Sequence, residues 1–310
     1  MAGSENTGKN KGKAGAVMKE IVILSGKGGV GKSSLTAALA HLLTENGTRL
    51  TLADTDVDAP NLHIVLGAKF DRSRAVAASD KAIIDYEKCS RCMRCVDACA
   101  FDSIIGDNEP IIISYSCEGC GVCALVCPEE AVSVHPMENG KINFVTSGAV
   151  RVVAGELGIG ESSSGRLVDI VKREARQEAS LNGSDLLLTD GPPGIGCPVI
   201  AALKGSDYAI LVSEPTPSAL SDLQRITEVV RGFNIPAGAV LNRNDMDEKS
   251  ARITRDWLIR NEVPLLGEIP YDPCLPQALA CGALAVNMYP DAPSSLAIKE
   301  LYKAVKGLLD

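Results

Sequence analysis

Apolar and polar residues follow two different periods along this chain. Short apolar runs predict buried strands at residues 20–25, 50–56, 185–190, 207–213 and 238–242. Apolar residues at helical spacing predict helices at residues 34–45, 166–179 and 220–233. Because strands and helices alternate, we predict an α/β fold in which a parallel sheet carries helices on both faces, with its ligand at the carboxyl ends of the strands.

Both ends of the chain have patterns of their own. Residues 294–309 show helical periodicity with lysines between the apolar positions. This pattern fits a helix that closes against the sheet or an amphipathic helix on a membrane surface, and we favour core packing. Residues 1–18 carry lysines and many small residues, which predicts a disordered tail, with a basic docking segment as the alternative.

Eight cysteines form two runs with the same spacing, C-x2-C-x2-C-x3-C, and the second run begins 28 residues after the first (117 − 89). This is the spacing of bacterial ferredoxins, in which the fourth thiolate of each run binds the cluster of the other run. We therefore predict two [4Fe-4S] clusters with crossed ligands. The first would be held by Cys89, Cys92, Cys95 and Cys127, and the second by Cys99, Cys117, Cys120 and Cys123.

Zinc and disulfides are the alternative uses of these cysteines. Zinc sites use separated C-x-x-C pairs rather than this stepped run, and disulfides need an oxidising compartment. Residues 1–18 lack the apolar segment of a secretory signal, and no apolar run approaches the ~20 residues needed to cross a bilayer. We therefore expect a cytoplasmic protein. Pro128 follows the last cysteine of the second run, whereas Ala100 stands at the matching position of the first run. Loss of one iron from the irregular first run is therefore a minor alternative.

A glycine-rich loop after the first predicted strand predicts a phosphate site. Residues 26–33 satisfy G-x-x-x-x-G-K-[ST] between a predicted strand and a predicted helix. Glycines let backbone N–H groups approach phosphates, Lys32 brings a positive charge to the β- and γ-oxygens, and Ser33 would hold Mg²⁺. The predicted phosphate-binding residues are Gly26, Lys27, Gly28, Gly29, Val30, Gly31, Lys32, Ser33 and Ser34.

The additional lysine of this loop, Lys27, makes it similar to the deviant Walker A motif of the MinD, ParA, Mrp and nitrogenase iron-protein superfamily. The resemblance implies a dimer, with an identical chain or a related ATPase, that closes around two nucleotides while Lys27 reaches the partner's phosphates. The chain resembles a Mrp/MinD-type ATPase with an inserted ferredoxin module over nearly its whole length.

Aspartates near the ends of predicted strands extend this resemblance. Residues 50–61 resemble the second strand and switch I, so Asp56 would orient the attacking water and Asp54 would support the magnesium shell. Residues 185–194 resemble Walker B and switch II, with Asp190 as a magnesium-shell carboxylate. The resemblance thus implies that Lys27, Lys32 and Asp56 are catalytic and that Ser33, Asp54 and Asp190 serve magnesium.

Two later segments resemble the superfamily's base-binding side. Asn242 ends the strand from which the base is read, and Pro270 and Asp272 lie in a segment similar to the following base-side loop. Residues 242–245 also have the N-[KR]-x-D outline by which many GTPases read guanine through an aspartate, here Asp245. Because the superfamily accounts for Asn242 without Asp245, we predict ATP rather than GTP.

Composition limits the partners. The formal charge is −8, and there are only 4 Phe, 1 Trp and 6 Tyr, so nucleic acid gains neither electrostatic attraction nor stacking platforms. We therefore expect a redox protein as partner, and neither nucleic acid nor a membrane. Of the remaining cysteines, Cys197 lies just past switch II, where it is a candidate bridge for a cluster between subunits. Free cysteines are more often buried small hydrophobes, and we expect that role for Cys197.

Nucleotide motifs flank the cysteine runs, so the cysteine segment is an insertion. We predict a nucleotide-binding domain at residues 19–80 and 137–310 and an α+β ferredoxin-like domain at residues 81–136. The predicted function is an ATPase that couples nucleotide-driven dimer closure to electron transfer through its clusters. The alternative is a nucleotide-switched scaffold or carrier whose clusters are structural or sensory.

Overall fold

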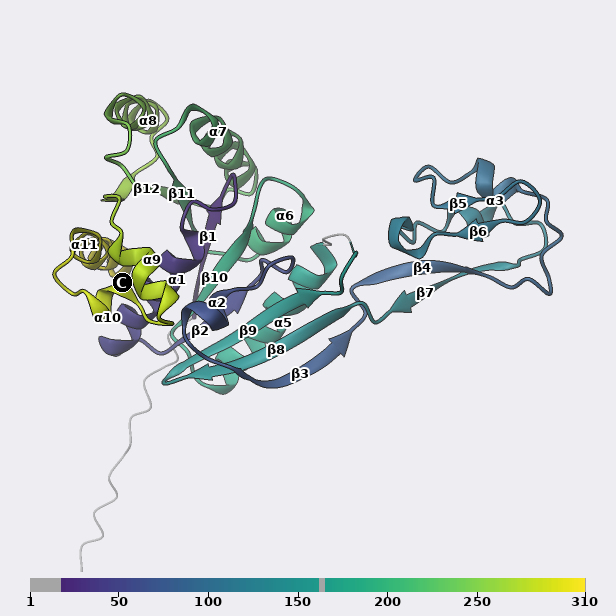
Figure 1. The fold of residues 1–310 in the computed structure, drawn as a ribbon, viewed down its shortest axis with the longest axis horizontal. Helices are drawn as coiled ribbons and strands as arrows, with labels where there is room; N and C mark the ends of the chain where they lie inside the picture. The colour runs from purple at the N-terminus through teal and green to yellow at the C-terminus, as the bar shows by residue number, and fades with distance from the viewer. Residues whose placement is uncertain (1–17, 162–164, 310) are drawn as a thin grey trace, which may run out of the picture.

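The body of the protein is built on a nine-stranded sheet (Figure 1), seen in a computed structural model that describes residues 18–161 and 165–309. Apart from Met18, the predicted tail lies outside the described residues. All neighbouring strands from β13 to β9 run parallel, whereas β8 and β3 extend the sheet in antiparallel fashion. In spatial order the strands are β13 (Leu265–Ile269), β12 (Ala237–Asn242), β11 (Tyr208–Ser213), β1 (Lys19–Ser25), β10 (Leu186–Pro193), β2 (Leu50–Asp54), β9 (Val150–Leu157), β8 (Gly140–Ser147) and β3 (Phe70–Val76).

The prediction of an α/β fold is confirmed, with a sheet that is largely rather than wholly parallel. Central strands are buried on both sides, since Ile21 and Ile23 of β1 face one apolar core and Val22 and Leu24 face the other. The first core is covered by α1 (Lys32–Glu45), α2 (Leu62–Val65), α10 (Ala285–Met288) and α11 (Pro293–Gly307). The second is covered by α5 (Gly165–Leu181), α6 (Cys197–Leu203), α7 (Pro217–Gly232) and α8 (Glu248–Arg260). Continuous apolar runs are the expected sequence of such doubly covered parallel strands.

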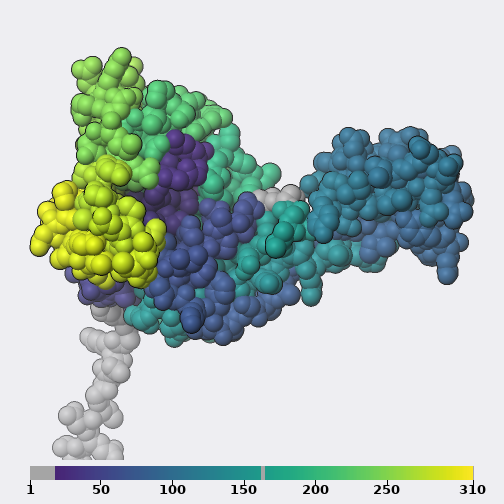
Figure 2. Space-filling model, in the orientation of Figure 1, coloured from purple at the N-terminus to yellow at the C-terminus, as the bar shows by residue number. Residues whose placement is uncertain are grey.

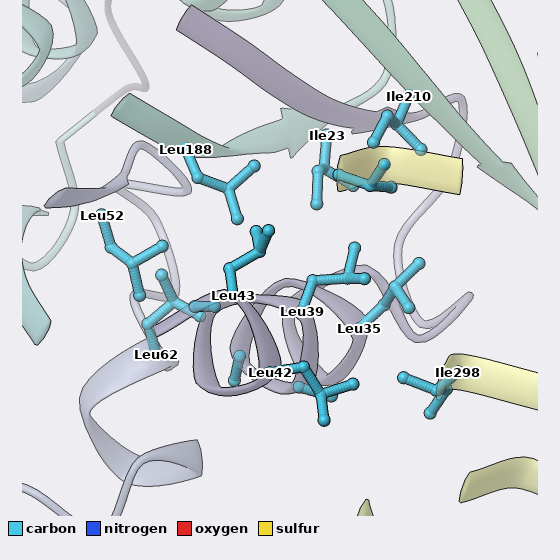
Figure 3. Close-up of a cluster of buried hydrophobic side chains, with 14 of the residues drawn as sticks. Ile23, Leu35, Leu39, Leu42, Leu43, Leu52, Leu62, Leu188, Ile210 and Ile298 are labelled. Atoms are coloured by element: carbon cyan, nitrogen blue, oxygen red, sulfur yellow. The ribbon is translucent and has the colours of Figure 1, made fainter. Parts of the chain in front are cut away.

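Helix α1 is fixed to the sheet by its leucines (Figure 3). Leu39 and Leu43 point from α1 toward Ile23 of β1 and Leu188 of β10. All four of these side chains are fully buried. Burial of such a side chain stabilises the fold by ~1.5–3 kcal/mol, so the start of α1 is held firmly at the carboxyl edge of the sheet.

The C-terminal helix α11 packs in the core, as we favoured. Ile298, Leu301 and Val305 are buried in the same cluster as the leucines of α1. Within the described part of the chain, no helix combines the length and the apolar character that a membrane crossing requires. The remaining helix of this region is α9 (Cys274–Ala280).

The cysteine segment projects from the body on a two-stranded antiparallel arm, β4 (Ser79–Ile84) and β7 (Val132–Met137) (Figures 1 and 2). It has its own small apolar cluster, in which Ala82, Ile84, Ile104 and Val132 pack with buried cysteines. Its other elements are short: α3 (Arg94–Asp97), β5 (Ile104–Ile105), β6 (Ile111–Ile112), the 3-10 turn η1 (Ser114–Ser116) and α4 (Val122–Leu125). The ferredoxin-like domain at residues 81–136 stays a prediction.

Candidate functional site

The glycine loop lies between β1 and α1 at the carboxyl edge of the sheet. Gly29 and Gly31 have φ of +79° and +92°, which side-chain-bearing residues rarely adopt. A Cβ at Gly31 would also lie 2.5 Å from Asn242 Nδ2. Helix α1 begins at Lys32 without a side-chain cap, so the N–H groups of its first turn are available to an anion.

A cavity lies over this helix start and joins the loop to Asp56 and Asn61, which lie in the segment that resembles switch I. The structure thereby brings together most of the predicted phosphate-binding residues and Asp56. Its lining includes Gly28, Gly29, Gly31, Lys32, Ser33, Ser34, Asp56 and Asn61. The lining does not include Gly26, Lys27 or Val30; Gly26 instead packs closely on α7, since a Cβ there would lie 2.3 Å from Asp222 Cβ.

Lys32 lies between two of the predicted aspartates. Its Nζ donates to Asp190 Oδ1 at 3.1 Å and lies 3.9 Å from Asp56 Oδ2. Thr36 Oγ1 also donates to Asp190 Oδ1, at 3.1 Å, whereas the buried Asp190 Oδ2 has no hydrogen-bond partner among the described residues. Because buried carboxylate oxygens are normally satisfied, this free oxygen fits the water shell of a magnesium ion.

Asp54 is fully buried and fixes the loop that follows β2. Its carboxylate accepts from the backbone N–H groups of Asp56 at 3.3 Å and of Asn61 and Leu62 at 3.0 Å each. Burial, with the neighbouring Asp190 charge, raises the pKa of Asp54 to about 8, although the Leu62 N–H and Lys32 oppose the change. Burial also raises the pKa of Asp56 to about 6, against the effect of Lys32. The site therefore favours an additional cation.

Lys27 does not line the phosphate cavity in this single chain. Its Nζ lies 2.6 Å from Glu214 Oε1, and Glu214 Oε2 accepts from Arg243 Nη1 at 3.1 Å. Sequence reasoning missed Glu214, because it follows β11 as an isolated acid that belongs to no motif. Glu214 thus holds the lysine that the family resemblance assigns to a partner's phosphates.

A second cavity adjoins the first and has mostly apolar walls. Asn242, Pro270 and Asp272 all line it, as predicted for a base pocket. Other walls come from Leu35, Arg243, Ile269, Tyr271, Leu275, Pro276, Leu279 and Ile298. Gly31, Ser34, Arg243 and Leu279 line both cavities, so the two form neighbouring halves of one site.

Polar side chains at this pocket also fix its loops. Asn242 Nδ2 donates to the carbonyl of Val30 at 2.8 Å, which braces the glycine loop. Asp272 accepts from Cys274 N at 2.9 Å and from Ser294 N and Oγ at 3.1 and 2.9 Å. Burial opposes ionisation of Asp272, but these hydrogen bonds hold its pKa below the ordinary value. Asp245 does not line the cavity, and its carboxylate accepts from Tyr271 N at 2.7 Å.

In the cysteine segment, two small cavities each have four cysteines in their walls. Each cavity takes three cysteines from one run and the fourth from the other. These are the predicted crossed sets, and their binding of clusters stays a prediction. One is lined by Cys89, Cys92, Cys95 and Cys127 together with Ile84, Pro110 and Val132. The other is lined by Cys99, Cys117, Cys120 and Cys123 together with Ala82, Phe101, Ile104 and Val122.

The sulfur atoms receive backbone hydrogen bonds. Arg91 N donates to Cys89 Sγ, Ser103 N to Cys99 Sγ, Ala82 N to Cys117 Sγ and Ala131 N to Cys127 Sγ, at 3.2–3.4 Å. Burial raises the pKa of Cys95 and Cys123, whereas backbone N–H donors outweigh burial at Cys99 and lower its pKa. Apolar walls and N–H donors around thiolates fit an iron–sulfur cluster. Among the described residues, no three His, Cys, Asp or Glu side chains are placed to hold a single metal ion; in a cubane, by contrast, each thiolate binds a different iron.

The other three cysteines lie outside the two cysteine-lined cavities. Cys197, at the start of α6, and Cys281, after α9, are exposed, and Cys274 is partly exposed. The expectation that Cys197 is a buried small hydrophobe is therefore wrong, because Cys197 lies at the exposed start of a helix rather than on a core face.

Comparison with known proteins agrees with the nucleotide site. A family described as the CobQ/CobB/MinD/ParA nucleotide binding domain matches residues 21–285. An uncharacterized protein of Methanocaldococcus jannaschii is 35% identical over 296 residues, 94% of this chain and 98% of that protein. An iron-sulfur cluster carrier protein of Deinococcus radiodurans is 23% identical over 301 residues, 94% of this chain and 70% of the carrier. The solved structure of the septum site-determining protein MinD of Pyrococcus horikoshii, complexed with Mg-ADP, has the same fold, with a TM-score of 0.59, 23% identity, and coverage of 94% of this chain and 97% of MinD.

Proposed function

Since the chain belongs to the CobQ/CobB/MinD/ParA nucleotide-binding family, we propose that it is a dimerising ATPase that couples MgATP binding and hydrolysis to electron transfer through two [4Fe-4S] clusters. The observation that carries the redox part is the pair of small apolar cavities, each walled by four cysteines from both runs. Packing alone would not require each cavity to combine cysteines of both runs.

The two adjoining cavities account for the nucleotide part. The phosphates would lie against the start of α1, where Lys32 and the backbone N–H groups face them, and the base would lie between the apolar walls of the second cavity. Ser33, with Asp190 and Asp54 behind it, would hold Mg²⁺, which when bound neutralises charge on the β- and γ-phosphate oxygens. The Mg-ADP complex of the P. horikoshii MinD, which shares this fold, supports this choice of ligand.

Hydrolysis would depend on positioning rather than on covalent chemistry. Asp56 borders the phosphate cavity and would orient the water that attacks the γ-phosphate. Its pKa of about 6, set mainly by burial, leaves the carboxylate ionised near neutral pH, where it accepts a hydrogen bond from that water.

ATP is the nucleotide that we propose. Guanine recognition would need the Asp245 carboxylate at the base, but that carboxylate is engaged by Tyr271 N and lies outside the walls of the cavity. Competition binding tests the choice. Tighter binding of GTP than of ATP, abolished by Asp245→Ala, would overturn it.

Dimer closure would need Lys27 to change partner. In the single chain the Lys27 ammonium is neutralised by Glu214, which Arg243 also binds. Arg243 lines both cavities, so a bound nucleotide can compete for it and loosen the hold of Glu214 on Lys27. Lys27 would then be free to reach the phosphates bound by a second subunit.

The proposal is tested by anaerobic reconstitution. We expect about eight irons per chain, four for each cubane, and a broad brown absorbance that bleaches on reduction. ATP hydrolysis should then differ between oxidised and reduced protein. Stoichiometric zinc without a visible chromophore would contradict the redox part, whereas hydrolysis that ignores the oxidation state would contradict the coupling.

A carrier or scaffold is the second candidate, because an iron-sulfur cluster carrier protein is similar over 94% of this chain. The family resemblance places the carried cluster on a C-x-x-C pair, and this sequence has no such pair outside its ferredoxin runs. Transfer assays discriminate between the two functions. Stoichiometric transfer of both clusters to an iron-free acceptor would favour the carrier, and retention of the clusters through repeated redox cycles would favour electron transfer.

A further inference from the structure

The two cysteine-lined cavities lie at different distances from the body of the protein. Strand β4 leaves the body at Ser79 and runs outward to Ile84 (Figure 1). Ala82 lines the cavity of Cys99, Cys117, Cys120 and Cys123, which we call the proximal cavity. Ile84, two residues or ~7 Å farther along the strand, lines the distal cavity of Cys89, Cys92, Cys95 and Cys127.

A buried ammonium lies beside the proximal cavity. Lys81 is 3% exposed, and its Nζ donates to the carbonyl oxygen of Cys117 at 3.0 Å. The same Nζ lies 3.0 Å from Glu161 Oε2, whose side chain is 13% exposed. Next to this pair, Asp80 is neutralised by Arg166 at 2.9 Å. Thus Lys81 and Glu161 are a largely desolvated ion pair in direct contact with a cluster-ligand residue.

Glu161 belongs to the body, not to the arm. It follows strand β9, and its Oε2 accepts from Asn139 Nδ2 at 2.7 Å. Asn139 joins β7 to β8 and donates also to Ser79 Oγ at 2.7 Å, where β4 begins. Glu161 and Asn139 therefore clamp both strands of the arm at the point where they leave the sheet.

This clamp is tied to switch I through the end of β9. Gly158 N donates to the Asn139 carbonyl at 2.8 Å, and Leu157 N donates to the Val57 carbonyl at 2.9 Å. Val57 is the residue between Asp56 and Asp58, and its buried side chain packs in the second core. A displacement of switch I would therefore move the strand end that carries Glu161.

We propose that the Lys81–Glu161 pair sets the reduction potential of the cluster in the proximal cavity and transmits the state of the nucleotide site to it; this rests on the proposed function. Reduction moves one electron from an external one-electron donor onto the cluster and makes it more negative. A nearby desolvated ammonium stabilises that added charge, and a carboxylate opposes it. When switch I moves on nucleotide binding, Glu161 changes its hold on Lys81, and the potential of the proximal cluster changes with it. Lys81 and Glu161 act as positioning residues and carry no electron themselves.

Substitutions on the two sides of the pair have opposite expected effects. Lys81→Met removes the ammonium at nearly constant volume and should make one of the two midpoint potentials more negative. Glu161→Gln leaves the ammonium unopposed and should make the same potential more positive. Lys88→Met is the matched control, because Lys88 is a 65% exposed lysine of the same segment paired with Asp85, and solvent screens its charge.

The measurement is an EPR-monitored redox titration of the reconstituted full chain, with and without MgATP. We expect opposite shifts for the two variants, none for Lys88→Met, and loss of the MgATP-dependent shift in Glu161→Gln while nucleotide binding is retained. If both variants keep their full iron content but their midpoint potentials shift with the same sign, or do not shift, this inference is overturned while the proposed function stands. Failure to bind iron in the wild-type chain would overturn the proposed function together with it. If Lys81→Met loses iron, the sign of the Glu161→Gln shift decides.

Discussion

Asp54, Asp56 and Asp190 gather around the ammonium of Lys32, and at the scale of single residues this excess of buried negative charge governs the nucleotide site. A magnesium nucleotide would bring the cation that this group of aspartates favours. The motifs predicted these four residues, because each stands at the end of an apolar strand or glycine loop. No sequence motif indicated Glu214, Lys81 or Glu161, since each is an isolated charged residue whose partner is distant in the chain.

The charge excess makes the stability of the nucleotide-free protein depend on pH. Burial, then Asp190, raises the folded-state pKa of Asp54 from 3.8 to about 8, so between these values the folded state binds more protons than the unfolded state. The free energy of unfolding should therefore fall as pH rises through this window, by at most about 1.4 kcal/mol per pH unit from this group. Urea denaturation at pH 6 and pH 8 measures the change.

Asp54→Asn should reduce that pH dependence, and the exposed Asp58→Asn should leave it as in the wild type. An unchanged difference between pH 6 and pH 8 in Asp54→Asn would show that Asp54 is not its source.

Substitution of the two loop lysines should impair different steps, ATP binding for Lys32 and dimerisation for Lys27. Lys32→Ala removes a buried charge at the phosphate cavity and should weaken ATP binding by about 1.5–3 kcal/mol, a factor of roughly 10–150. Lys27→Ala should keep ATP binding and lose ATP-dependent dimerisation and hydrolysis. Calorimetry measures binding, and analytical ultracentrifugation measures the dimer.

Glu214→Gln is the companion test, because it removes the carboxylate that holds Lys27 at 2.6 Å. We expect a tighter ATP-dependent dimer in this variant. Normal dimerisation of Lys27→Ala with ATP would rule out the shared site, whatever Glu214→Gln does.

Among the elements, β9 connects two parts of the proposed coupling: its end contacts the segment that resembles switch I and the base of the arm. Its Gly155 leaves no space for a side chain: a Cβ there would lie 2.5 Å from Val171 Cγ2 and 2.7 Å from Val57 Cγ1. Gly155→Ala should therefore lower the free energy of unfolding by roughly 1–3 kcal/mol through overpacking. Chemical denaturation measures the loss.

Gly232→Ala is the control, since open space surrounds Gly232 at the end of α7 and alanine is the better helix former. It should leave stability unchanged or raise it. Equal effects of the two substitutions would show that β9 is not tightly packed against switch I.

The sequence predicted some elements better than others for a physical reason. Doubly buried strands such as β1 and β11 are continuous apolar runs, which stand out between helices. Strands β8 and β9 form an antiparallel hairpin in which an exposed charged residue, Lys141 or Arg151, interrupts each run of buried residues, and such interrupted runs are harder to identify as strands. The arm was placed by its cysteines, whereas the clamp at its base depends on Asn139 and Glu161, which belong to no motif.

At the scale of the whole molecule, the proposed crossed ligation assigns one proposed cluster to the proximal cavity and the other to the distal cavity. Cys99→Ser should damage the same cluster as Cys120→Ser, because both cysteines line the proximal cavity. Cys92→Ser should instead affect the distal one. EPR of singly substituted, reconstituted proteins distinguishes the clusters. If Cys99→Ser matched Cys92→Ser, ligation would follow the runs and the crossed arrangement would be wrong.

The nucleotide site and the clusters form one coupled device only if closing the first changes the second. Asp56→Ala should bind MgATP but leave its water unaligned, because correct positioning contributes up to ~7–11 kcal/mol in favourable cases, and the closed dimer should accumulate. The most direct measurement is the midpoint potential of each cluster in this trapped dimer and in the nucleotide-free protein. We predict a shifted potential on MgATP binding, larger for the proximal cluster; identical potentials and identical rates of reduction in the two forms would contradict the coupling.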